Sequence, residues 1–287
     1  MIQNYLRVAR AGDRQNYHHW LTPFLKEVAR KDEIKGKMKV IHPKNKQICL
    51  TTGEFAKINA KKPNDFCVEF LENLDTDLAY AQMSNNTEDN DNLLTITKQY
   101  LEGKIRIVWD ENEKVIFDTW ASNLNQGTGT PHYWFYRLEY YLWKDKEKRN
   151  IEIQIDGKRI NFGAIADNYR FRGLNSIEHI QPQSKADEWK QWEEKNPQKD
   201  KKCEIDDFGN LALISQSFNS SLSNQDMEKK WIDIRKNKDV ESLKMCLAYA
   251  SVKGDYKAWK PDKAKEHQNE MLEILKASLG IDVENEE

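Results

Sequence analysis

A glutamate and a histidine stand side by side at the end of a short apolar run, as Glu178 and His179 after Ile177. A carboxylate oxygen is a good ligand for a hard divalent cation such as Mg²⁺ or Mn²⁺. A neutral imidazole can take the proton from an attacking water, because histidine titrates near neutrality. Pro182 ends the run, since proline cannot donate to a strand ladder. The pair indicates metal-assisted hydrolysis, with Glu178 as a metal ligand and His179 as the general base.

A second group of residues extends this pattern downstream. The turn signal Gly209–Asn210 leads into the apolar run Leu211–Ile214, which predicts a second strand. Asn219 and residues 220–223 are typical of a helix start, and the helix is expected to continue over 224–231. The local plan is strand, loop, strand, helix. Its amide oxygen makes Asn219 the second expected metal ligand.

The motif EHIQPQ, followed by GNLALISQSFNSSLSN, resembles the HNH (ββα-metal) nuclease domain at the C-terminus of GmrSD-type modification-dependent restriction proteins. It is similar, more distantly, to the HNH domain of RNA-guided CRISPR nucleases, whose motif opens with Asp-His. An isolated Glu-His pair is weak evidence, whereas the combination of both motifs is specific. The resemblance covers residues 169–231.

The resemblance implies a role for each matching position. Glu178 matches the first metal ligand and His179 the general base. Asn210 matches the middle asparagine of the catalytic centre, whose side chain ties down the loop between the two strands. Asn219 matches the last metal-ligand position. The implied cofactor is Mg²⁺ or Mn²⁺, and the implied reaction is cleavage of DNA.

Several polar residues near the motif are candidate DNA contacts. Asn224 and Lys230 match positions of the following helix that support the site or contact phosphate. Arg170 and Arg172 precede the first strand and are candidate phosphate ligands. The insert 184–202 interleaves lysines with tryptophans, but its acidic residues favour a solvated helix over a DNA-binding one.

Composition narrows the class of protein. The chain has 287 residues, of which 38% are hydrophobic and 32% charged, and its formal net charge is −2. No apolar run approaches the roughly 20 residues that span a bilayer, and the N-terminus lacks the apolar stretch of a signal peptide. We therefore expect a cytoplasmic protein without membrane contact. The charge does not suit a dedicated DNA-coating protein, but a nuclease needs only a local basic surface.

The cysteines Cys49, Cys67, Cys203 and Cys246 show no CxxC spacing. This argues against a zinc ribbon and, without a secretion signal, against a disulfide framework. The paired cysteines of zinc-stabilised HNH proteins are missing, so packing alone must hold the fold.

The remaining patterns predict an α+β protein. Residues 1–168 form a mainly helical N-terminal region with a few strands, which we assign to recognition or partner binding. Residues 169–287 form the ββα-metal HNH module with C-terminal helices. The elements expected elsewhere are helices near 17–29, 65–74 and 93–101, strands at 37–42 and 47–51, a polar linker over 84–92, alternating stretches at 105–109 and 115–120, an aromatic helix over 132–144, and a polar helix from 256 onward.

Two of these segments admit a functional alternative. The aromatic helix over 132–144 could stack on bases, but burial in a core is the commoner cause of such a pattern. The segment NQGTGT over 125–130 has two glycines but lacks the Lys-Ser/Thr of a phosphate-binding loop, so we interpret it as a plain loop.

Together these observations predict a metal-dependent HNH endonuclease that acts in bacterial anti-phage defence or restriction. GmrSD-type proteins commonly carry a nucleotide-sensing domain with a DGQQR-like motif, which this sequence lacks. We therefore expect a partner, such as an ATPase or sensor protein. Two alternatives stay open: a catalytically silent HNH-like subunit that binds DNA or a partner, and an RNA-cleaving toxin with the same chemistry.

Overall fold

The computed structural model describes residues 21–30, 37–42, 46–51, 63–83, 90–102, 104–105, 113–149, 151–155, 158–197, 203–236 and 240–281. The chain packs as two compact units, one formed by Met1–Trp120 with Ser278–Glu287 and one by Ala121–Ala277. The described part is mostly helical with a few short strands, which confirms the α+β expectation. None of its helices combines the length and apolar composition that crossing a bilayer requires. Of the predicted segments, residues 17–20, 84–89 and 106–109 lie outside the described residues.

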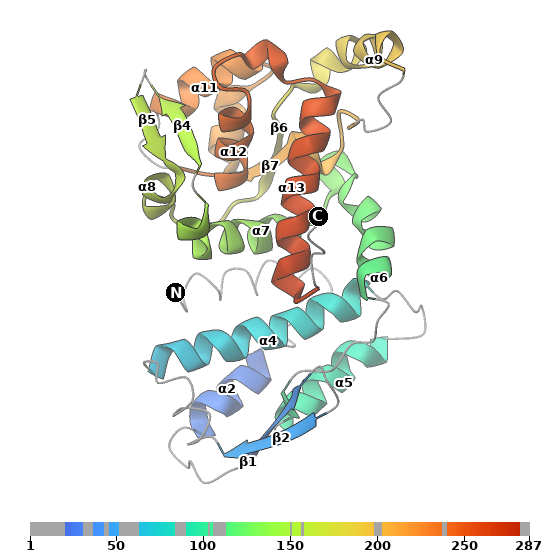
Figure 1. The fold of residues 1–287 in the computed structure, drawn as a ribbon, viewed down its shortest axis with the longest axis vertical. Helices are drawn as coiled ribbons and strands as arrows, with labels where there is room; N and C mark the ends of the chain where they lie inside the picture. The colour runs from blue at the N-terminus through green and yellow to red at the C-terminus, as the bar shows by residue number, and fades with distance from the viewer. Residues whose placement is uncertain are drawn as a thin grey trace. The chain divides into compact units, whose positions relative to one another are not determined.

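The first unit combines four described helices with a small sheet (Figure 1). The helices are α2 (Leu21–Arg30), α4 (Pro63–Met83), α5 (Asn90–Leu101) and α6 (Glu113–Trp120). The strands β1 (Lys37–His42) and β2 (Lys46–Thr51) are antiparallel, and the short β3 (Lys104–Ile105) pairs in parallel with β1. Phe70, Leu74 and Leu78 of α4 pack with Ile96 and Tyr100 of α5, which forms the core of this unit.

The alternating stretch 115–120 is not extended but forms most of α6. Phe117 and Trp120 lie one helical turn apart, both are buried, and their ring centroids are 6.0 Å apart. Three-residue spacing places them on one helical face. Packing of this face overrides the local alternation.

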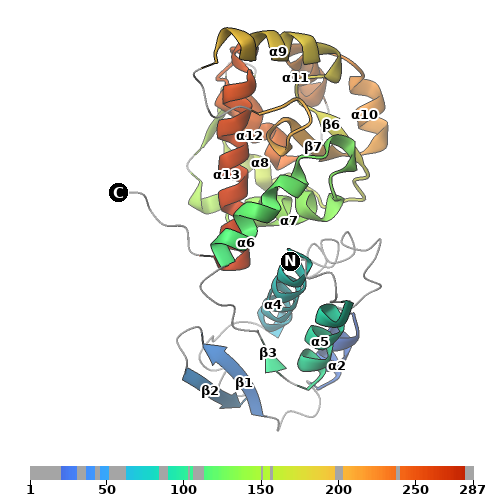
Figure 2. The ribbon, with the colours of Figure 1, turned by 90° about the vertical axis from the view of Figure 1, so that its right-hand side faces the viewer.

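The second unit is built around the aromatic helix α7 (His132–Lys144) and the hairpin β6 (Ser176–His179) and β7 (Leu211–Ile214). Residues 133–142 of α7 are all buried, which confirms the core interpretation. The helices α7 and α12 (Leu243–Ser251) both contact β7, and α10 (Gln216–Leu222) contacts β6 (Figure 2). A second hairpin, β4 (Glu152–Ile155) and β5 (Lys158–Asn161), precedes α8 (Phe162–Asp167), and β4 contacts α12.

The helix expected over 224–231 is interrupted. Helix α10 starts one residue after Ser215, whose side chain caps it by accepting a hydrogen bond from the Phe218 N–H. It ends at Leu222, and the next residue, Ser223, has a positive φ of 51°. A new helix, α11 (Met227–Lys236), then begins. Asn219 therefore lies within a short helix rather than at a helix start.

Two helices complete the unit. The charged insert forms α9 (Ala186–Lys195), whose only described buried side chain is Trp189. The polar C-terminal helix is α13 (Pro261–Leu279), which begins with proline at a position that needs no backbone donor. The buried residues Met271, Leu275 and Leu279 form its apolar face. Residues 121–168 pack with the β6–β7 hairpin in the second unit. The boundary at 168 that we expect from the sequence divides the chain by proposed function and not by packing.

Candidate functional site

The Glu178–His179 pair lies at the carboxyl end of β6. Glu178 pairs with Ala212 and His179 with Leu211 across the hairpin. The side chains of Glu178 and His179 are both buried. Successive residues of a strand point to opposite faces. The two side chains therefore make different contacts, one with helix α11 and one with the loop that joins the strands.

His179 is bound by the loop. Its Nε2 lies 2.7 Å from Asp206 Oδ1, and the same oxygen accepts a hydrogen bond of 3.0 Å from Gln183 Nε2. Partial burial acts to raise the pKa of Asp206, but the hydrogen bonds from Gln183 and His179 outweigh it and the pKa is lowered. Asp206 was missed in the sequence, because it is one of many acidic residues around the charged insert and no spacing marks it.

Glu178 is bound by helix α11. Lys230 Nζ lies 2.5 Å from Glu178 Oε1 and also donates to the carbonyl oxygen of His179 at 2.5 Å. The two side chains are only 8% and 1% exposed. Burial raises the pKa of Glu178, and the Lys230 ammonium acts against this shift. Burial likewise lowers the pKa of Lys230, with Glu178 opposing it. The contact is a buried ion pair that ties helix α11 to Glu178 and to the backbone of His179.

The Asn210 side chain is completely buried and makes four hydrogen bonds. Its Oδ1 accepts from the Gln181 backbone N–H at 2.8 Å and from Trp259 Nε1 at 3.0 Å. Its Nδ2 donates to the carbonyl oxygens of Gln181 and Ile205, at 3.0 and 2.9 Å. Gln181 and Ile205 lie near the two ends of the loop between β6 and β7, so this side chain closes the loop.

Asn219 lies on α10 and faces β6. Its Nδ2 donates to Ser176 Oγ at 2.6 Å, so the amide oxygen remains the ligand-type atom. Ser176 and Glu178 are alternate residues of β6 and share a face, roughly 7 Å apart along the strand. The structure thus places Asn219 along the same face as Glu178, with Ser176 as its direct contact.

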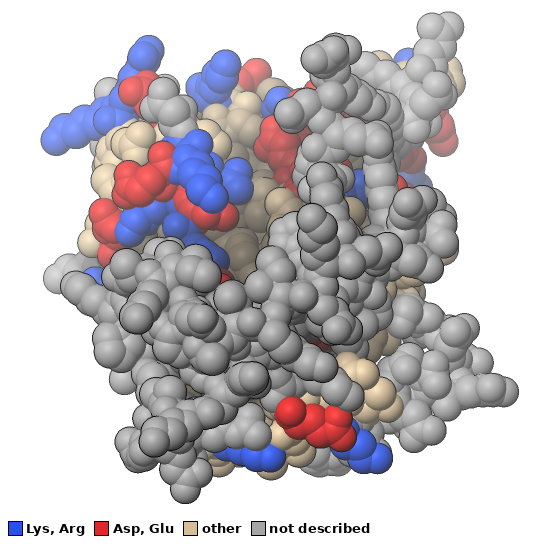
Figure 3. All heavy atoms as spheres, turned by 60° about the horizontal axis from the view of Figure 1, so that its bottom comes forward, with Lys and Arg blue, Asp and Glu red and all other residues tan. Residues whose placement is uncertain are grey.

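The candidate DNA contacts differ in exposure and in the groups that they bind. Arg170 is exposed and donates to the carbonyl oxygens of Asp167 and Tyr169 at 2.7 and 3.1 Å. Arg172 lies 3.7 Å from the buried carboxylate of Glu241. Asn224 is exposed in the turn after α10. Lys230, in contrast, is buried and forms an ion pair with Glu178. On the face drawn in Figure 3, described basic and acidic side chains intermingle rather than form a block of one sign.

The candidate ligands fit a magnesium site with few protein ligands. Within the described ranges no three His, Cys, Asp or Glu side chains converge as a metal site. Mg²⁺ is commonly held by one or two carboxylates together with waters and substrate phosphate. The Glu178 carboxylate and the Asn219 amide oxygen supply such a set. Any ion there would share Glu178 with the Lys230 ammonium.

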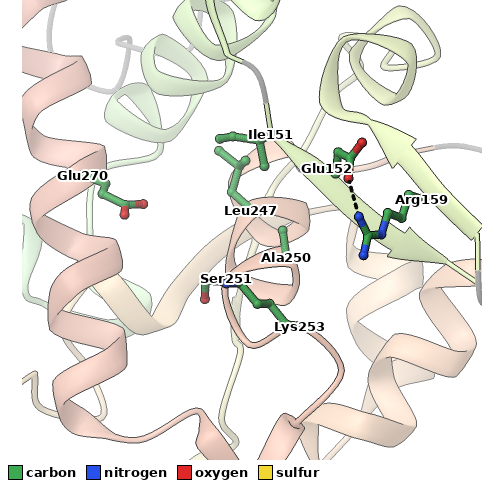
Figure 4. Close-up of a pocket in the computed structure, with 8 residues that line it drawn as sticks. All are labelled: Ile151, Glu152, Arg159, Leu247, Ala250, Ser251, Lys253 and Glu270. Carbon is green, nitrogen blue, oxygen red and sulfur yellow. Dashed lines mark ion pairs between the residues drawn. The ribbon is translucent and has the colours of Figure 1, made fainter.

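A cavity of about 750 Å³ lies elsewhere in the second unit (Figure 4). None of the expected site residues lines this cavity. Its lining comes from the β4–β5 hairpin, α12 with the turn after it, and α13, and consists of Ile151, Glu152, Arg159, Leu247, Ala250, Ser251, Lys253 and Glu270. Glu152 and Arg159 form an ion pair of 3.5 Å across the hairpin, so they neutralise each other. This cavity is separate from the His179 group.

Comparison with known proteins gives one family match. The family described as GmrSD restriction endonucleases, C-terminal domain, matches residues 109–274, which is more than half of the chain. The matched region contains the β6–β7 hairpin, α10, α11 and the residues that close the loop. No curated protein and no solved structure matches.

Proposed function

Because this chain belongs to the family of the C-terminal domain of GmrSD restriction endonucleases, we propose that it is a metal-dependent HNH endonuclease that hydrolyses DNA phosphodiester bonds. Membership itself indicates a nuclease of the restriction type. The ββα-metal assignment of β6, β7 and α10, the DNA substrate and the metal belong to the proposal. The observation that carries it is the buried Glu178–His179 pair at the end of β6, beside a loop closed by Asn210.

In this proposal each residue has a distinct task. His179 takes the proton from the attacking water. Glu178 and Asn219 would hold Mg²⁺ or Mn²⁺, which when bound supplies stabilisation of the charge that develops on the scissile phosphate. Asn210 keeps the loop ends fixed, and Lys230 holds Glu178 and the backbone of His179 in place. Preorganisation of this kind matters because small displacements of reacting groups slow a reaction strongly.

DNA is the proposed partner, with Arg170, Arg172 and Asn224 as candidate backbone contacts. For Lys230 we propose a role in holding Glu178 in position and not in contacting DNA, because its ammonium group is buried and forms an ion pair with Glu178. We further propose that residues 1–168 recognise DNA or a partner, that an ATPase or sensor protein controls the nuclease, and that the protein is a cytoplasmic effector of anti-phage defence or restriction. Tightly regulated, specific cleavage by the purified chain alone would overturn the need for such a partner.

Cleavage of plasmid DNA tests the proposal. Wild type should nick supercoiled plasmid with Mg²⁺ or Mn²⁺ and lose that activity in EDTA. His179→Ala should reduce nicking by about 100-fold or more, as removal of a general base does. His132→Ala, on α7, is the matched control and should nick like wild type. Equal nicking by wild type and His179→Ala would favour a silent binding subunit, and cleavage of RNA but not duplex DNA would favour the toxin.

A further inference from the structure

The contact between His179 and Asp206 has a chemical polarity. An ionised carboxylate can only accept hydrogen bonds, so in the neutral ring the proton must lie on His179 Nε2, 2.7 Å from Asp206 Oδ1. The other ring nitrogen, Nδ1, then carries the free lone pair. Gln183 Nε2 donates to the same carboxylate oxygen at 3.0 Å and fixes its position from the other side. Asp206 therefore selects which nitrogen of His179 can act as a base.

Asp206 is in turn held by the glycine segment 125–130. The Gly127 N–H donates to the backbone carbonyl of Asp206 at 3.0 Å. Gly127 has a φ of +54°, and a Cβ built there would lie 2.9 Å from Asp206 Oδ1. Both features favour glycine, because a side chain there would crowd the Asp206 carboxylate and most other residues adopt a positive φ only at an energetic cost.

A neighbouring asparagine anchors the same segment. Asn125 Oδ1 accepts from the Phe208 N–H at 3.0 Å and from Gln268 Nε2 at 3.3 Å. Segment 125–130 is thus bound to the residue that follows Asp207 and to helix α13. The 3₁₀ turn Gly127–Gly129 also contacts β6 directly. The sequence interpretation of a plain loop misses this placement against the His179 side of the hairpin.

We propose that Asp206 is a positioning residue for His179, and that the segment around Gly127 is the part of the fold that holds Asp206 in place. The inference rests on the proposed function, in which His179 is the general base. It adds that Nδ1 is the atom that takes the proton from water, while Nε2 stays bound to Asp206. This arrangement fixes both the tautomer and the orientation of the ring.

Stability and positioning can be separated at Asp206. Its side chain is 48% exposed, and ion pairs in such places contribute little to folding. Asp206→Ala should therefore fold like wild type. Loss of activity in that variant would report on His179 rather than on the stability of the unit.

The first experiment compares Asp206→Ala with Glu204→Ala, which removes an exposed carboxylate two positions away. In plasmid nicking, Asp206→Ala should lower kcat by about 10- to 100-fold and leave the KM for DNA within about twofold of wild type. Glu204→Ala should match wild type in both. A kcat for Asp206→Ala within about twofold of wild type would overturn the proposal.

The second experiment reads the tautomer without relying on activity. Ring ¹⁵N signals of His179 are identified by their loss in His179→Ala and recorded above the ordinary pKa of histidine. Wild type should show a protonated Nε2 and an unprotonated Nδ1, and Asp206→Ala should show a mixture of the two tautomers. The same tautomer in both proteins would refute the positioning role. If His179→Ala still cleaves DNA, the proposed function fails, whereas the tautomer result still decides the His179–Asp206 relationship.

The glycine segment has its own matched pair of variants. Gly127→Ala should reproduce the loss of kcat seen with Asp206→Ala, because its Cβ would meet the carboxylate. Gly129→Ala should be silent, since its nearest neighbour would be Gln126 Cβ at 3.8 Å. Equal activities of the two glycine variants, with both folded by thermal melting, would show that the segment does not hold Asp206 for catalysis.

Discussion

The ammonium group of Lys230 lies 2.5 Å from Glu178 Oε1, and neither side chain has appreciable access to solvent. The same ammonium donates to the backbone carbonyl of His179. One cation on α11 therefore contacts both residues of the motif at the end of β6. It compensates the charge of Glu178 within the protein itself and ties helix α11 to the strand.

Removal of one partner of this ion pair should be costly. Lys230→Met leaves a buried carboxylate without its cation and should lower the free energy of unfolding by about 3 kcal/mol or more. In the double variant Glu178→Gln/Lys230→Met no buried charge remains unpaired, so much of this loss should be recovered. Urea denaturation of the wild type, both single variants and the double variant measures the coupling. Strictly additive losses would contradict a direct ion pair.

Asn210 should be more important for stability than a loop asparagine usually is. Asn210→Ala removes four hydrogen bonds and leaves backbone groups of the half-buried Gln181 and Ile205, and the buried indole N–H of Trp259, without this partner. Each unsatisfied buried group costs about 1–3 kcal/mol, so we expect a loss above about 3 kcal/mol. Trp259→Phe removes one of the four bonds and should cost clearly less. Thermal melting of both variants measures this, and equal losses would argue against Asn210 as the centre of the network.

Glu139 should make stability fall as the pH rises toward neutrality. Its carboxyl group accepts hydrogen bonds from Ser242 Oγ and from the N–H groups of Leu243 and Lys244, and burial raises its pKa to about 7. Because the folded pKa lies above the unfolded one, the folded state holds an extra proton between about pH 4.5 and 7. Its contribution is complete below this window and is lost through it, at up to about 1.4 kcal/mol per pH unit.

Glu139→Gln tests this pH dependence. The unfolding free energy of wild type minus that of Glu139→Gln should decrease as the pH rises from about 5 to 7. Glu194→Gln removes an exposed carboxylate of α9 and controls for the change in net charge. A difference between wild type and Glu139→Gln that stays constant over this range would contradict a raised pKa.

Asn219 should affect the response to metal more than the fold. Its amide nitrogen makes a single described hydrogen bond, to Ser176 Oγ, on a half-buried side chain. Asn219→Ala should therefore lower stability by about 1 kcal/mol. We expect it to raise the Mg²⁺ concentration for half-maximal nicking by about 10-fold or more, because one of the two proposed protein ligands is lost. Ser176→Ala removes the hydrogen bond but keeps the amide and should leave the metal response near wild type.

The sequence predicts the elements that carry this site better than it predicts their contacts. The run Leu211–Ile214 is apolar throughout and is a buried strand with the predicted bounds. The aromatic pattern over 132–144 also gives the right helix, because burial on several faces leaves few other solutions. Both results depend on local pattern alone.

Two of the features that the sequence does not reveal depend on residues distant in the chain. Lys230 stands in the charged stretch EKKW, where lysines are ordinarily exposed, and only its packing against Glu178 reveals its burial. The break after Ser223 depends on a positive φ that the sequence does not require there. Asp206 gains its relevance from His179 and Gly127, and no spacing rule joins those three positions.

The closure of the loop by Asn210 limits how this module can be moved between proteins. Its partner Trp259, the Asn125 contact with Phe208 and the Glu139 cap on α12 all lie outside the motif that runs from 169 to 231. A fragment or graft cut to that motif would lose every one of these bonds. The portable unit is set by those distant anchors, and all of them lie within the compact unit Ala121–Ala277.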